Sequence, residues 1–120
     1  MLSIRQSYIV MFNLLDKYYR DTKDDCLGSL LGGFNPNLFI GSMSADPAAW
    51  NDWKISVKKI TTNEFLTFDE TLQAIKIFVV FHKETFGFNL VWLIDKLNLI
   101  SVDDIMWSTI VKQAMKNGVP

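Results

Sequence analysis

Apolar residues recur at steps of three and four along most of this chain, a spacing that places them on one face of an α-helix. The first such stretch runs from Ile4 to about Arg20, and the stretch after Thr67 is apolar on nearly all sides, which predicts a central helix. An all-α protein is therefore expected. The residues that define its helical faces are Ile4, Tyr8, Met11, Phe12, Leu15, Tyr19; Leu27, Leu30, Leu31; Trp50, Trp53, Val57, Ile60; Leu72, Ile75, Phe78, Val79, His82; Leu90, Leu93, Ile94, Leu97; and Ile105, Met106, Ile110, Ala114.

Residues that favour helix ends delimit these stretches. Ser3–Gln6 and Thr67–Glu70 each match a capping box, in which two side chains satisfy amide groups of the first turn. Asp46 before Pro47 places an acceptor at a helix cap and proline at the first helical position, where no amide donor is needed. The other predicted boundaries are Asp24 or Asp25 and Gly32–Gly33 for the second helix, Thr61–Asn63 after the third, Asn89 before the fifth, and Ser101–Asp104 and Asn117–Gly118 for the sixth.

The size of the chain fits one domain. Its 120 residues are 49% hydrophobic and 13% aromatic, which is enough to build one core. We expect a single compact helical domain over 1–120, with five or six helices. Two segments also resemble each other 63 positions apart, with identities at Thr22/Thr85, Leu27/Leu90 and Leu30/Leu93. Two related helical hairpins joined by the Trp-bearing helix would explain the likeness, and so would chance similarity of two amphipathic segments.

Other patterns bear on the compartment. The apolar runs Ile75–Phe81 and Leu97–Val102 are interrupted well before the roughly 20 residues that a membrane span requires. Met1–Gln6 does not have the pattern of a secretory signal, so a cytoplasmic location without membrane association is the expectation.

Cys26 is the single cysteine. Its neighbours Asp24 and Asp25 disfavour a thiolate, so a small apolar filler is the preferred interpretation over a reactive thiol.

Charge is nearly balanced, with 12 basic and 13 acidic residues and a formal charge of −1. Direct binding of nucleic acid needs a concentrated basic face, so we do not expect it. Lys112 and Lys116 lie near the C-terminus, whereas six aspartates lie in the first half of the chain, namely Asp16, Asp21, Asp24, Asp25, Asp46 and Asp52. They fit either scattered solvated charges or an acidic patch that faces a basic partner.

The sequence offers little material for catalysis. His82 is the single histidine, and it lies in an apolar run. Catalysis would need a carboxylate and a Ser or Cys brought to it by the fold, whereas the simpler interpretation is a buried or partner-facing imidazole with hydrogen-bonded ring nitrogens. The glycines of Gly28–Gly33 lack the spacing of a phosphate-binding loop. We expect no catalytic residue, no cofactor and no metal site; an apolar pocket where Asp, His82 and Ser or Thr converge would instead favour an enzyme.

Two short signatures combine acidic and large apolar side chains. They are Asp24–Gly32 (DDCLGSLLG) and Ser44–Trp53 (SADPAAWNDW). Trp50 and Trp53 are three residues apart and share a helical face, which fits either a core anchor or the centre of a binding surface. The carboxylates beside the indoles keep the binding interpretation open. The candidate partner-binding residues are Asp24, Asp25, Asp46, Trp50, Asp52 and Trp53.

These signatures, together with Tyr18–Tyr19, resemble a group of small bacterial proteins identified as immunity proteins of polymorphic toxin systems, including contact-dependent growth inhibition. The resemblance covers about the first half of the chain. It implies a non-enzymatic protein that binds a cognate toxin domain and blocks it. Proteins of this kind often face basic nucleases, although a formal charge of −1 departs from the strong acidity of a phosphate mimic. The alternative is a helical adaptor or regulatory protein that binds a cellular protein, and self-association is left open.

Overall fold

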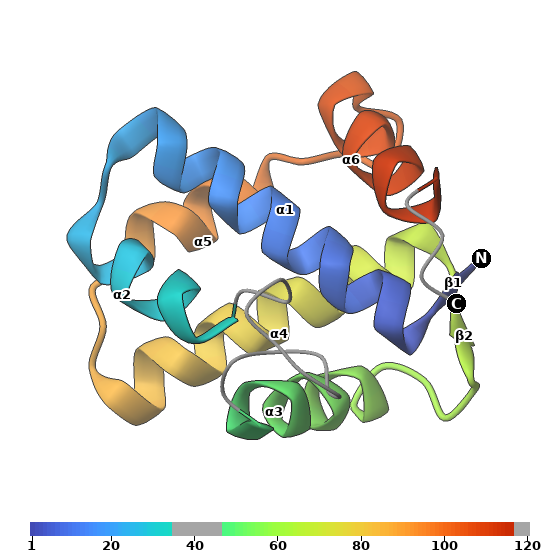
Figure 1. The fold of residues 1–120 in the computed structure, drawn as a ribbon, viewed down its shortest axis with the longest axis horizontal. Coiled ribbons are helices and arrows are strands. Elements are labelled where there is room, and N and C mark those ends of the chain that lie inside the picture. The colour runs from blue at the N-terminus through green and yellow to red at the C-terminus, as the bar shows by residue number, and fades with distance from the viewer. Residues whose placement is uncertain (35–46, 117–120) are drawn as a thin grey trace.

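Two long helices, α1 (Ile4–Thr22) and α4 (Phe68–Phe86), cross the middle of the molecule (Figure 1). The structure is a computed structural model that describes residues 1–34 and 47–116. Over these residues the chain forms one helical domain with six helices and a two-stranded antiparallel sheet, which confirms the predicted all-α class. The remaining elements are β1 (Leu2–Ser3), α2 (Asp25–Phe34), α3 (Pro47–Lys58), β2 (Phe65–Leu66), α5 (Val91–Asn98) and α6 (Ile105–Lys116).

Both predicted capping boxes are confirmed. The Ser3 hydroxyl accepts from the Gln6 amide at 3.0 Å, while the Gln6 side chain accepts from the Ser3 amide at 2.9 Å. Thr67 and Glu70 form the same pair of bonds at the start of α4. Each box satisfies two amide groups that a helix start leaves without intrahelical partners, so the two long helices begin where the sequence indicates.

Two predicted boundaries are wrong. Gly32–Gly33 does not end α2, which continues to Phe34 and so places that ring in the core, 5.1 Å from the ring of Phe78. Asn89 does not cap α5 either: Leu90 is the cap residue and makes no side-chain hydrogen bond there. Leu90 is fully buried, so packing rather than side-chain chemistry positions the start of this helix.

The short sheet, which the helical periodicity did not predict, relates the two halves of the chain. In it Leu2 pairs with Leu66 and Ser3 pairs with Phe65. Leu2 and Leu66 are both fully buried and lie 64 positions apart. An antiparallel ladder has a local two-fold axis at each residue pair, and the axis through the Leu2–Leu66 pair relates each residue to the one 64 positions away.

The same shift of 64 relates the two long helices. Every buried position of α1 corresponds to a buried position of α4, and the left-handed cap residues Lys23 and Gly87 correspond as well. The long helices thus correspond at a spacing of 64, so the alignment at 63 that the sequence suggested is wrong on these helices. Because apolar residues are often adjacent in these helices, alignments at 63 and at 64 both pair apolar residues with apolar residues. The corresponding pairs are Ser7/Thr71, Tyr8/Leu72, Val10/Ala74, Met11/Ile75, Leu14/Phe78, Leu15/Val79 and Tyr18/His82.

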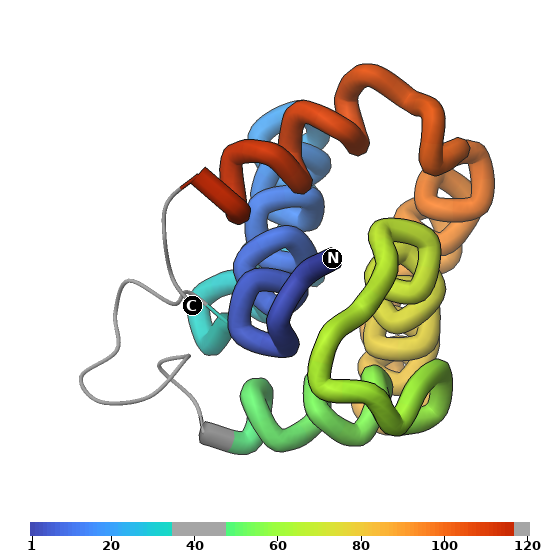
Figure 2. The backbone as a smooth tube through the Cα atoms, turned by 90° about the vertical axis from the view of Figure 1, so that its right-hand side faces the viewer, coloured from blue at the N-terminus to red at the C-terminus, as the bar shows by residue number. Residues whose placement is uncertain are grey.

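Each half therefore has the order strand, long helix, short helix, third helix. Figure 2 shows the result: α1 and α2 lie on one side, α4 and α5 on the other, with α3 below and α6 above. The third helices are exchanged, since α3 packs most extensively on α4 and α6 on α1. Both third helices have 12 residues and carry a fully buried tryptophan, Trp53 and Trp107.

Candidate functional site

The two sequence signatures meet at a cavity of about 240 Å³ between α2, α3 and the end of α4. The second half of α2 supplies one wall and the first half of α3 supplies another. Asp52 and His82 contribute polar groups, and the aromatic rings come from Phe34, Phe86 and Phe88. The full lining is Ser29, Leu30, Gly33, Phe34, Ala48, Ala49, Asp52, His82, Phe86 and Phe88.

His82 is buried at the base of this site, and both of its ring nitrogens face polar partners. Nδ1 lies 2.8 Å from the carbonyl oxygen of Phe78, one helical turn earlier. Nε2 lies 3.9 Å from Oδ2 of Asp52 on α3. Burial lowers the pKa of His82 below its ordinary value, an effect that the hydrogen bond to Phe78 and the Asp52 charge oppose. The imidazole is therefore neutral at neutral pH, with its proton on Nδ1, where it is donated to the carbonyl.

Ser29 lines the same cavity, so the pocket contains the three residue types of a nucleophilic triad. A working triad needs one imidazole nitrogen on the carboxylate and the other on the hydroxyl. In His82 the nitrogen that faces away from Asp52 is bonded to the Phe78 carbonyl. With the imidazole in this position, His82 does not link Asp52 to Ser29.

The acidic residues of the first signature lie elsewhere. Asp24 caps α2, where its Oδ2 accepts from the Leu27 amide at 3.0 Å, and Asp25 is exposed in the first turn. Neither residue lines the cavity, because the lining begins one turn later at Ser29. Asp46 lies outside the described residues. Of the predicted carboxylates, the structure thus places Asp52 at the cavity and Asp24 and Asp25 at the opposite end of α2.

The two candidate tryptophans have different roles. Trp53 is 0% exposed, and its indole nitrogen donates to the Ser7 hydroxyl at 3.1 Å. It is a core residue and cannot present its ring to a partner, so its assignment to the binding surface was wrong. Trp50 is half-buried: its ring packs edge-on against Tyr8 at 5.6 Å, and the Lys54 ammonium lies 5.7 Å from the ring centre. Trp50 remains a surface candidate.

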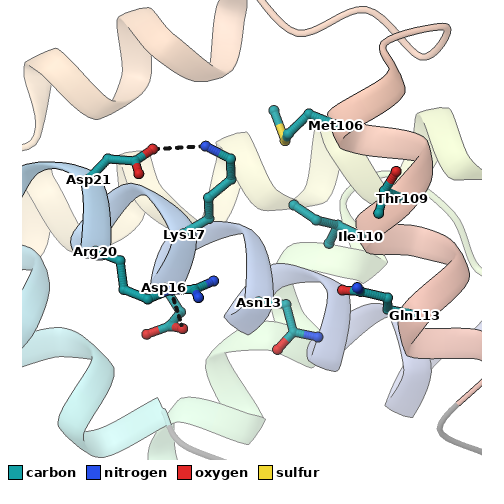
Figure 3. Close-up of a pocket in the computed structure, with 9 residues that line it drawn as sticks. All are labelled: Asn13, Asp16, Lys17, Arg20, Asp21, Met106, Thr109, Ile110 and Gln113. Carbon is teal, nitrogen blue, oxygen red and sulfur yellow. Dashed lines mark hydrogen bonds and ion pairs between the residues drawn. The ribbon is translucent and has the colours of Figure 1, made fainter.

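A second, larger cavity of about 650 Å³ lies between α1 and α6 (Figure 3). Charged side chains of α1 line one wall, and they pair within the helix. Lys17 bonds Asp21 at 2.8 Å, and Arg20 lies 3.3 Å from Asp16. The hydrogen bond from Lys17 lowers the pKa of Asp21. Because these charges neutralise each other, the cavity offers no concentrated field to a charged ligand.

The described residues show no further chemical centre. Among them, no three His, Cys, Asp or Glu side chains lie close enough together to hold a metal ion. None of the helices in 1–34 and 47–116 has the length and apolar character needed to cross a membrane.

No protein-family model matches the chain, and no curated protein or solved structure is significantly similar to it. The sequence analysis missed the pairing of Asp52 with His82 and the aromatic cavity around them. The nearest signal was the run of apolar residues before His82, which predicts burial but not a partner 30 positions earlier.

Proposed function

We propose that this protein is an immunity protein that binds a cognate toxin domain and blocks it without chemical turnover. The observation that carries the proposal is the convergence of the two signature segments, which carry the resemblance, on one cavity. Residues from Ser29 to Phe34 and from Ala48 to Asp52 form its facing walls. Segments that resemble immunity proteins thus supply one continuous surface rather than two unrelated ones.

The cavity fits a basic side chain of the toxin. Its rim carries Phe86, which is 57% exposed, next to half-buried Phe88 and Leu30. Asp52 adds a carboxylate beside the neutral imidazole of His82. Aromatic and aliphatic groups pack well on the stem of a Lys or Arg, while a carboxylate in a partly dry site attracts its charged head. Asp24 and Asp25 add negative potential at the far end of α2 and assist the approach of a cationic toxin surface.

Co-expression with the product of the adjacent toxin gene tests the proposal. Ser29→Trp puts bulk into the mouth of the cavity from an exposed helical position, so protection of the cells should be lost and the complex should no longer form in a pull-down. Lys112→Trp adds the same bulk at an exposed position of α6, away from the cavity, and should keep protection.

Three outcomes count against this function. They are the absence of any complex with the toxin, a complex that gives no protection, and protection that survives Ser29→Trp but not Lys112→Trp. Capture of a defined cellular protein at the same cavity would instead support an adaptor.

A further inference from the structure

Corresponding faces of the two long helices line two grooves that differ in polarity. The α1 wall of the polar cavity in Figure 3 consists of Asn13, Asp16, Lys17, Arg20 and Asp21. Their counterparts 64 positions later line a groove of about 390 Å³ beside α4, namely Ile77, Val80, Phe81, Glu84 and Thr85. Asp16 and Lys17 of the first groove thus correspond to apolar Val80 and Phe81 in the second, while the position of Arg20 keeps a charge in Glu84. Ile55 of α3, which is 48% exposed, extends this apolar surface through a smaller hollow that it shares with Phe81.

The groove beside α4 has a positive and a negative end. Lys76 and Glu84 line it four residues before and four residues after Val80, or about 6 Å along the helix on either side. Within the described residues neither side chain forms an ion pair. Lys59, at the end of α3, lines the groove as well.

The order of charged and apolar side chains along this face of α4 is complementary to the same face of a second copy that runs in the opposite direction. An isologous dimer requires that a surface complement itself after a two-fold rotation. If two α4 helices pack antiparallel about Val80, Lys76 of each copy meets Glu84 of the other, and the apolar side chains meet at the centre. On α1 the position of Val80 is taken by Asp16, so the same packing would bring two carboxylates together on the axis.

We propose that two copies of this chain form a dimer through the groove beside α4, with the α4 helices antiparallel and Val80 near the two-fold axis. Ile55, Ile77 and Phe81 form the apolar centre of the interface, and two Lys76–Glu84 pairs flank it. The dimer surface adjoins the proposed toxin contact, because Asp52 lines both the toxin cavity and the hollow that Ile55 and Phe81 share.

Sedimentation velocity of the full chain, from low micromolar concentration upward, tests the proposal. The wild type should show a monomer–dimer equilibrium. Lys76→Glu and Glu84→Lys each introduce two like-charge contacts across the axis, so each should weaken the dimer about tenfold or more. The double variant Lys76→Glu/Glu84→Lys restores both pairs in reversed order and should recover the wild-type dissociation constant. Asp95→Lys, on the exposed face of α5, is the matched control and should leave association unchanged.

All three substituted side chains are at least partly exposed, and circular dichroism should show the same helical content in every variant. A wild-type protein that stays monomeric at every concentration overturns the proposal. The same result is expected if another protein, and not a second copy of this chain, fills the groove. Two results overturn the antiparallel arrangement about Val80. One is a dissociation constant that neither single charge reversal changes, and the other is a double variant whose dimer is as weak as that of either single variant.

Discussion

The indole nitrogen of Trp53 donates a hydrogen bond of 3.1 Å to the hydroxyl of Ser7, which in turn donates to the carbonyl of Ile4 at 2.6 Å. The bond joins α3 to the first turns of α1 inside the core. Trp107, the fully buried tryptophan of α6, lies at a different position of its helix, and its indole nitrogen has no hydrogen-bond partner among the described residues. Each half therefore buries a tryptophan, but the two halves differ in how its polar atom is accommodated.

Ser7→Ala should lower the free energy of unfolding by about 1–3 kcal/mol, because it leaves a buried indole N–H without an acceptor. Urea denaturation followed by tryptophan fluorescence measures the change. Ser108→Ala is the matched control, since Ser108 is half-buried on α6 and no side-chain hydrogen bond joins it to the described residues. Its effect should stay within about 0.5 kcal/mol. Equal losses in the two variants would show that the Ser7 bond contributes nothing specific.

Acidification should destabilise the fold through His82. Burial holds the pKa of His82 below its ordinary value, so between the folded and unfolded pKa values the unfolded chain binds more protons. The stabilising contribution of the neutral imidazole is present above about pH 6.5, the ordinary pKa, and is lost as the pH falls toward the folded value. Denaturation midpoints of wild type and His82→Gln, measured across this window, should converge as the pH falls. Parallel curves would contradict the assignment.

Two glycines of α2 should differ in how alanine at each position changes the stability of the protein. A Cβ on Gly28 would lie 2.7 Å from Cε1 of Tyr19, so the Tyr19 ring must move, whereas a Cβ on Gly32 meets nothing within 4 Å. Gly32→Ala should stabilise the protein by up to about 1 kcal/mol, the difference in helix propensity. Gly28→Ala should be less stable than Gly32→Ala by about 1–3 kcal/mol, the usual cost of overpacking. Thermal melts of the two variants decide this, and the opposite order would show that Tyr19 yields freely.

The caps that end the long helices offer a second matched pair. Lys23 and Gly87 both adopt the left-handed conformation, with φ of 56° and 71°. Gly87→Ala should cost about 1 kcal/mol, since its new Cβ has open space and the cost comes from the backbone alone. Lys23→Gly should instead stabilise the fold by a few tenths to about 1 kcal/mol. Chemical denaturation measures both, and a loss of stability in Lys23→Gly would show that its contact with the Tyr19 ring outweighs the strain.

Local sequence chemistry was sufficient to predict the helices but not the site. The boxes at Ser3 and Thr67 depend on residues three positions apart, so they could be recognised directly. The end of α2 could not, because the helix continues through two glycines to bury Phe34 against a ring 44 positions later. The pairing of Asp52 with His82 and the Leu2–Leu66 bridge depend on how the two halves pack, and no short-range pattern encodes that.

The exchange of α3 and α6 has a consequence for how the chain can be divided. Cutting it between Lys58 and Phe65 would separate each long helix from the helix that covers it. Trp53 would then lose its contact with the ring of Phe78, whose centre lies 5.5 Å away, so isolated halves should not persist as folded bodies even though each contains a complete set of elements.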